Sequence, residues 1–482
     1  MASVGNSQAD GGRLRRNAVG LPHILFQSVT MAAPGASLAF SLAVGIAFAG
    51  PVLPLSVLIA MVGCLLVAYS LSQQAKYLPS AGSLFTYANK AYGRRGGFFV
   101  GWSAAFYILF FTPAVYLLFP VVVQDVLARD LGLNVGWAPW AILGAAIVTA
   151  AALRGVHFSA SLAMVMGALE IAVFVALAIW MLVVQRHHLS TVPFTPSESA
   201  AGGFNGVFKG AVFGILAFTG FEAAAAFGEE GREPRRTIPR ALLLSTAIVG
   251  VFYVISSYAW VIGSGVESFT KTAGASANPW NDLATRYWGV GWIAVFLALI
   301  NSVFAVTLSA VNSGSRILFA MARAGMLPQQ LARVHPRHGT PHIAILAMSA
   351  WGLVIALLAG WKWGISTGFG VVATVLTIFA IVAYISASLG TVVYFRRFRR
   401  DDFHMLRHGV VPIAGAAAFA VPLYYLFIPL PSAPLVYANW FSLAIIVALI
   451  LVMAFAKTRA LPLVGDEHMG LVDMEVIPGT DQ

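Results

Sequence analysis

The chain has 482 residues, of which 59% are apolar and only 10% are charged. Soluble domains carry about 25% charged residues, so this composition excludes a water-soluble, disordered or fibrous protein and indicates one that is embedded in a lipid bilayer. The single cysteine, Cys64, excludes an internal disulfide. The net charge is +11, but the basic residues are placed along the chain as in a membrane topology signal, so we expect no nucleic-acid partner.

Crossing a bilayer takes about 20 apolar residues in a helix. Twelve runs meet this requirement, and none alternates with period two as the strands of a membrane barrel do. Numbered as helices 1 to 12, they cover residues 21–46, 52–71, 97–122, 137–153, 158–184, 207–228, 241–264, 289–315, 343–361, 366–395, 409–429 and 436–456. The sequence therefore predicts an all-α membrane protein with twelve transmembrane helices.

Lysine and arginine set the expected orientation. With a cytoplasmic N-terminus, 23 of the 29 basic residues lie inside, and the six outside are Arg129, Arg186, Lys209, Lys271, Arg286 and Lys362. This bias places the tails 1–20 and 457–482 in the cytoplasm of a multi-pass protein of the plasma or inner membrane. The polar start of the chain predicts no cleavable signal peptide.

Two connecting segments are expected to form helices of their own. Residues 80–93 predict a short helix at the cytoplasmic surface, with Leu84, Tyr87, Ala88 and Ala91 on one face. Residues 265–287 make an outer loop that is long enough for another helix.

Helices 1 and 6, which stand five apart, both carry a helix-weakening site. Helix 1 reads Ala32-Ala33-Pro34-Gly35-Ala36-Ser37, and helix 6 reads Ala217-Phe218-Thr219-Gly220-Phe221-Glu222. With five helices in a unit, the second copy enters the membrane from the opposite side. The pattern therefore indicates an inverted repeat of residues 21–184 and 207–395, followed by 409–456. Paired interruptions of this kind point to the binding site of a transporter, although Gly and Pro are common in membrane helices.

Three stretches resemble the amino acid–polyamine–organocation (APC) transporter family. The matching residues are Pro79, Gly82, Tyr87, Gly93, Phe98, Gly101 and Trp102 after helix 2; Phe218, Gly220, Phe221, Glu222, Glu229, Glu230, Pro234, Arg236, Ile238, Pro239 and Arg240 around helix 6; and Arg316, Ala322, Arg323, Leu327, Pro328 and His335 to Pro341 after helix 8. The resemblance covers almost the whole chain. It implies the LeuT-type five-plus-five inverted repeat with two extra helices, a substrate bound between broken helices 1 and 6, and alternating access. Pro34-Gly35-Ala36 departs from the paired glycines of many members.

An unwound turn in a membrane helix exposes amides and carbonyls, which can bind the carboxylate and the ammonium of a small substrate. We expect an amino acid, or alternatively a polyamine or other organic amine, to bind at these turns. The candidate binding residues are Ala33, Pro34, Gly35, Ala36, Ser37, Tyr107, Phe218, Thr219, Gly220 and Glu222. Phe218 is a candidate aromatic lid, with ordinary helix packing as the alternative.

Only two of the 18 acidic residues, Glu170 and Glu222, fall inside the predicted spans. A charged carboxylate at mid-bilayer costs about 2.5–3.5 kcal/mol, so each requires an explanation. We expect both to take part in proton coupling. Glu170 could instead be a neutral acid bonded to a neighbouring helix, and Glu222 could cap the second half of helix 6 or pair with a substrate amine.

The polar residues Asn301, Ser302, Thr307 and Ser309 of helix 8 keep sodium open as the less favoured coupling ion. No cofactor and no metal site are expected, because none of the ten histidines joins a set of ligands with metal spacing. The sequence has no P-loop, Gly-x-Ser-x-Gly or HExxH motif. We therefore expect a secondary active amino acid transporter and not an enzyme. The alternatives are an exchanger, a membrane-embedded lipid enzyme and a channel.

Overall fold

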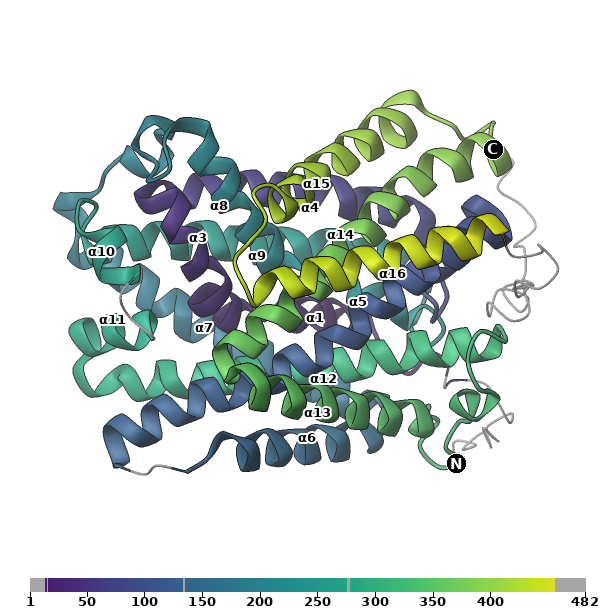
Figure 1. The fold of residues 1–482 in the computed structure, drawn as a ribbon, viewed down its shortest axis with the longest axis horizontal. Helices are drawn as coiled ribbons and strands as arrows, with labels where there is room; N and C mark the ends of the chain where they lie inside the picture. The colour runs from purple at the N-terminus through teal and green to yellow at the C-terminus, as the bar shows by residue number, and fades with distance from the viewer. Residues whose placement is uncertain (1–13, 15, 133–134, 275–277, 456–482) are drawn as a thin grey trace, which may run out of the picture.

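The computed structural model describes residue 14 and residues 16–132, 135–274 and 278–455, and these residues form a bundle of helices (Figure 1). The β-structure within them is one isolated bridge between Val19 and Gly231. Ten helical stretches in the described chain are long and apolar enough to cross a membrane, and a further apolar helix, α6 (Trp137–Leu153), is shorter. The expectation of an all-α membrane protein is confirmed.

The predicted apolar runs all overlap helices. The first five runs correspond to α1 (Leu21–Met31), α2 (Pro34–Ala36), η1 (Ser37–Ser41) and α3 (Leu42–Ala49), then α4 (Leu53–Ala75), α5 (Leu84–Leu131), α6 (Trp137–Leu153) and α7 (Val156–Val184). The remaining runs correspond to α8 (Gly203–Phe218) with η6 (Phe221–Phe227), then α9 (Pro234–Ser264), α12 (Trp292–Arg323), α13 (His342–Trp363), α14 (Ile365–Phe398), α15 (Val411–Phe427) and α16 (Leu435–Phe455).

The interrupted helix at the N-terminus lies inside the bundle. Helix α1 packs against α7, α9 and α12 and also touches η6. Helices α5 and α14 form the most extensive helix pair, and α4 packs against both α8 and α9. This arrangement brings the breaks in the first and sixth predicted helices together in the interior.

Both connecting segments contain helices, as expected. After α9 the chain forms α10 (Phe269–Gly274) and α11 (Pro279–Trp288). Residues 84–93 form the first part of α5, which bends at Gly93. The face formed by Leu84, Tyr87, Ala88 and Ala91 is buried against neighbouring segments of the bundle. The position of this helix at the cytoplasmic surface stays a prediction.

Candidate functional site

The first helix is interrupted directly before its proline. Helix α1 ends at Met31, and Ala33 adopts a left-handed conformation with φ 48° and ψ 66°. The chain then resumes as α2 and the π-helical turn η1. The Ser37 hydroxyl donates a 2.8 Å hydrogen bond to the Ala32 carbonyl, so the turn itself satisfies one exposed acceptor.

The second break touches the first. Helix α8 ends at Phe218, and Gly220 has φ 109° before η6 begins. A Cβ at Gly220 would lie 2.4 Å from the Met31 Cγ and 2.8 Å from the Met31 carbonyl oxygen. Both the backbone conformation and the available space therefore require glycine at this position.

Tyr253 of α9 joins the two breaks. Its hydroxyl lies 2.8 Å from the Ala32 carbonyl oxygen and 3.0 Å from the Ala217 carbonyl oxygen. One hydroxyl carries one proton, so it donates to one of these carbonyls at a time. The sequence offered no signal for this residue, because a tyrosine in an apolar helix resembles ordinary core.

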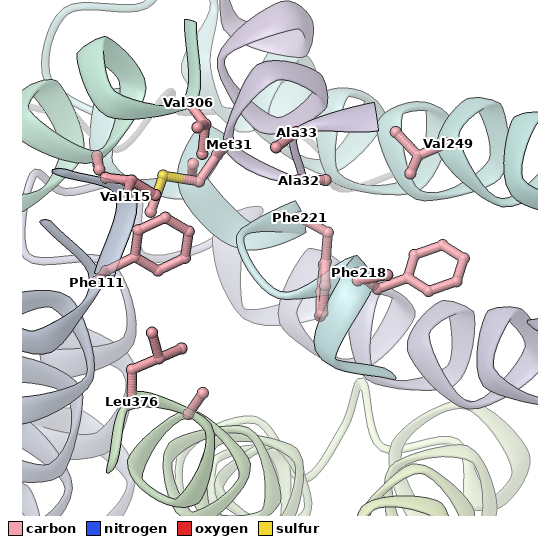
Figure 2. Packing of buried hydrophobic residues seen from close by; sticks show 14 of the residues in the cluster. Met31, Ala32, Ala33, Phe111, Val115, Phe218, Phe221, Val249, Val306 and Leu376 are labelled. Carbon is pink, nitrogen blue, oxygen red and sulfur yellow. The ribbon is translucent and has the colours of Figure 1, made fainter. Parts of the chain in front are cut away.

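A small cavity of about 60 Å³ lies beside the breaks. Its lining comes from the first broken helix, α5, α8, α12 and α14, and includes no charged side chain among the described residues. The polar lining groups are Ser37, Ser41 and Thr219. Figure 2 shows Met31 beside Phe111 and Val115 at this site. The cavity is therefore apolar, with a few hydroxyl groups.

The expected binding residues divide into three groups. Those that line the cavity are Ala33, Ala36, Ser37 and Thr219. Pro34, Gly35 and Gly220 form the breaks without lining it. Glu222, Tyr107 and Phe218 are buried outside the lining.

Phe218 points away from the cavity. Figure 2 shows its ring directed away from Met31 and Phe111, on the side where Val249 of α9 lies. The ring also packs edge-on against Tyr253, with 5.3 Å between the ring centroids. The structure thus places Phe218 in helix packing and not over the cavity as a lid.

Glu222 is held by a tyrosine. The Tyr384 hydroxyl of α14 donates a 2.5 Å hydrogen bond to the Glu222 carboxylate and accepts a 3.3 Å bond from the Gly220 amide. The Tyr107 ring packs against Tyr384 with 6.1 Å between centroids. The backbone amides of Gly220 and Glu222, at the start of η6, are also neighbours of this carboxylate, as expected of an acid that caps the second half of the broken helix. Tyr384 was missed by the sequence reasoning.

Glu170 of α7 lies against the first break. Its side chain is fully buried, and neither carboxyl oxygen makes a hydrogen bond of ordinary geometry with a described residue. The Ser302 hydroxyl and the Gly35 amide are neighbours of the carboxyl group. Ser302 also accepts a 3.0 Å bond from the Ala36 amide. Each of the two predicted intramembrane acids therefore stands beside a helix break.

The polar residues of α12 have different partners. Ser302 and Ser309 reach the first helix, where the Ser309 and Thr30 hydroxyls are 2.5 Å apart. Asn301 donates instead to the Met166 carbonyl of α7, and Thr307 donates to Val303 on its own helix. No group of three or more His, Cys, Asp or Glu side chains suited to a metal ion occurs in the described part of the chain.

A polar layer ties four distant segments together at one end of the bundle. Arg316 of α12 is buried in an ion pair with Glu230, and Arg323 forms a 2.5 Å pair with Glu229. Glu229 also accepts a 3.1 Å bond from the Ala81 amide. The Ala18 amide donates a 2.8 Å bond to the Glu230 carbonyl. From the sequence these charges are expected in loops and helix ends, and their burial is not predicted.

Comparison with known proteins adds family information to this geometry. A family model described as amino acid permease matches residues 24–455. The chain is 29% identical over 319 residues to the branched-chain amino acid permease BcaP of Bacillus subtilis (strain 168), which covers 62% of this chain and 66% of that protein. It is 26% identical over 399 residues to the low-affinity putrescine importer PlaP of Escherichia coli (strain K12), covering 81% and 80%.

The fold also resembles a solved structure. The crystal structure of a mutant manganese transporter from Eremococcus coleocola gives a TM-score of 0.58 at 12% sequence identity. The similarity covers 90% of this chain and 93% of that chain. At this identity the similarity concerns the fold alone.

Proposed function

This chain belongs to the amino acid permease family, and we propose that it is a secondary active transporter of neutral amino acids with aliphatic side chains. The relatives described above are named as a permease and an importer, which agrees with a transport protein and not an enzyme. The expected resemblance to the APC transporters is confirmed by the family match.

The apolar lining of the cavity is the observation that favours an aliphatic substrate. No charged side chain of the described residues lines it, and the nearest expected counter-charge, Glu222, is already bonded to Tyr384. A cationic amine that entered the cavity would lose water without gaining a carboxylate partner, which is costly. An aliphatic side chain loses nothing there and gains contacts with Met31 and Phe111.

The size of the cavity agrees with a small substrate. A volume of about 60 Å³ offers room for roughly four to six water molecules. We propose that the aliphatic side chain occupies this space, while the ammonium and carboxylate groups meet the backbone at Ala33–Ser37 and Phe218–Glu222. The name of the Bacillus relative supports a branched-chain substrate, and that of the Escherichia relative keeps a polyamine as the second candidate.

Twelve membrane crossings complete the proposal, with ten helices in two inverted five-helix units and two further helices after them. The contact between Gly220 and Met31 supports it, because it joins two interruptions that stand five predicted helices apart. We further propose that both termini are cytoplasmic, in the plasma or inner membrane. Alternating access would then open the cavity to each side in turn by movement at the two breaks.

Proton coupling through Glu170 and Glu222 is part of the same proposal. Both carboxyl groups are buried beside a break, and neither forms an ion pair with a described basic residue. Burial favours the neutral form of a carboxyl group, so proton uptake and release can accompany opening to water. Sodium coupling and substrate exchange are the alternatives that the experiment must separate.

Uptake into proteoliposomes that contain the purified chain tests the function. Labelled leucine, arginine and putrescine are compared at equal concentration, with empty liposomes as the control. We expect saturable leucine uptake that unlabelled valine inhibits and putrescine does not. Because one methylene in an apolar pocket changes specificity about tenfold or more, alanine should compete poorly. Uptake of putrescine or arginine without leucine would contradict the proposed substrate.

A further inference from the structure

A second hollow, separate from the substrate cavity, lies between α5, α13, α14 and α16. We call it the lateral groove. It has a volume of about 560 Å³, and its lining includes Phe110, Trp351, Leu358, Phe441 and Lys362. None of its lining residues lines the substrate cavity. Leu358 is 56% exposed and Phe441 is 42% exposed. In a bilayer the groove therefore opens to lipid.

The deep end of the groove has a fixed aromatic floor. Pro113 in α5 has no amide, so the Leu109 carbonyl one turn earlier has no partner within its own helix. The Trp351 indole of α13 donates a 2.9 Å bond to that carbonyl. Phe110 packs edge-on against Trp351, with 6.3 Å between the ring centroids, and at 5.6 Å against Phe441. The floor is thus built by specific contacts and is a preformed surface.

The length of the groove matches one leaflet. Trp351 and Lys362 both line it and are eleven positions apart on α13. At 1.5 Å per residue this separation is about 16 Å, which is about half of the ~30 Å hydrocarbon core. The lining therefore extends from near the middle of the membrane to one of its surfaces.

A cation stands at the surface end of the groove. Lys362 is the one charged lining residue, and it forms no ion pair with a described residue. Its ammonium group lies 5.1 Å from the centre of the Trp363 ring. Tyr437 of α16 also lines this end and is 55% exposed. Lys, Trp and Tyr together are typical of the level of the lipid head groups. In Figure 1, α13 and α16 lie on the face turned toward the viewer.

The chemistry of the groove favours one kind of occupant. An acyl chain gains little when it leaves the surrounding lipid for an apolar groove, because both environments are equally apolar. Selection must therefore come from the head group, and an unpaired ammonium favours a negative one. A second copy of the chain would have to bring an acidic residue to Lys362. A free amino acid would leave its charges unpaired against the aromatic floor.

We propose that the lateral groove binds an anionic phospholipid, whose acyl chain lies on Trp351 and Phe441 and whose phosphate pairs with Lys362. One lysine beside the head group should give about a fivefold preference for an anionic lipid. The groove thus binds a component of the membrane, and its occupation does not depend on the transport proposal.

Native mass spectrometry of the delipidated full-length protein tests this inference. Phosphatidylglycerol and phosphatidylcholine with the same acyl chains are titrated separately. We expect one phosphatidylglycerol to bind about fivefold more tightly than phosphatidylcholine. Lys362→Gln should remove the preference. Lys271→Gln is the matched control, because Lys271 is exposed on α10 and lies outside the groove, and it should keep the preference.

A second variant tests the acyl-chain contact. Leu358→Trp fills the groove from an exposed position, so it should reduce binding of both lipids without preventing folding. Glycerol phosphate, which has the charge but no acyl chain, should not compete. The proposal is overturned if Lys362→Gln retains the preference, if Leu358→Trp binds lipid normally, if glycerol phosphate displaces the lipid, or if a protein dimer that buries Leu358 forms instead.

Discussion

The Tyr253 hydroxyl lies 2.8 Å from the carbonyl oxygen of Ala32, at the point where the first helix loses its regular hydrogen bonds. The same hydroxyl lies 3.0 Å from the Ala217 carbonyl, at the end of α8. A single donor therefore serves acceptors from both breaks. Any movement that separates the breaks must carry one of the two carbonyl oxygens out of reach of this hydroxyl.

Removing that hydroxyl should impair transport more than stability. A hydrogen bond contributes about 1 kcal/mol, so Tyr253→Phe should change the balance between conformations about fivefold and lower uptake to a similar extent. Tyr258→Phe is the matched control, because its hydroxyl bonds the Ser190 carbonyl in a connecting segment. Uptake is measured per amount of purified protein. Equal uptake by the two variants would show that Tyr253 has no special role.

Gly220 should tolerate no side chain. Gly220→Ala places a Cβ 2.8 Å from the Met31 carbonyl oxygen and forces a non-glycine residue to φ 109°. We expect loss of uptake while the protein is still expressed. Gly202→Ala separates strain from contact, since Gly202 also has a positive φ of 80° but no atom within 4 Å of the added Cβ. Retained uptake in Gly220→Ala would contradict the role of the touching breaks.

The membrane-length helices and the places where two of them break can be predicted from patterns in the sequence. Apolar runs of membrane length predicted the helices, and the paired sites at Gly35 and Gly220 predicted where two of them weaken. The hydrogen bonds between different helices could not be predicted from the sequence. Tyr384 and Tyr253 lie in apolar helices, where a tyrosine resembles ordinary core. Their hydroxyl groups find hydrogen-bond partners only because α14 and α9 pack against the breaks.

Charge burial at the end of α12 was missed for a related reason. Arg316 lies in a basic segment, and a count of positive charges treats every such residue as solvated. An arginine can be buried when an acid from a distant part of the chain lies beside it. Glu230, in the segment before α9, is that acid for Arg316. The adjacent glutamates Glu229 and Glu230 were visible as a motif, but their partners were not.

That buried pair gives a stability prediction. Arg316→Met leaves Glu230 buried without its partner, which should cost about 3–5 kcal/mol and lower the midpoint of thermal unfolding in detergent. The double variant Arg316→Met with Glu230→Leu should recover much of this loss. Arg236→Met is the control, because the Arg236–Glu233 pair is largely exposed and should contribute little. A single variant as stable as the parent would show that the pair is not needed.

Membrane orientation can be tested with introduced cysteines. The native Cys64 is buried, so it should give little background labelling. We expect an impermeant thiol reagent to label Glu267→Cys in intact cells and to label Arg399→Cys only after the membrane is permeabilised. Both positions are exposed in the structure, which makes accessibility a matter of the side of the membrane. The reverse pattern would overturn the proposed orientation and the repeat argument.

Coupling to protons should depend on the two buried acids. With an inward proton gradient, leucine uptake should rise as the external pH falls. The reason is that each carboxyl group must be neutral when the site around it closes and excludes water. Glu222→Gln and Glu170→Gln each hold one site permanently neutral, so uptake by either variant should vary less with pH. Glu267→Gln changes an exposed acid between α9 and α10, so this variant is the control and should keep the parental pH profile. Proteoliposomes with proton and sodium gradients imposed separately provide the measurement. Uptake driven by sodium at constant pH would refute proton coupling. Accumulation of labelled leucine that requires unlabelled substrate inside the liposomes, and no ion gradient, would show exchange.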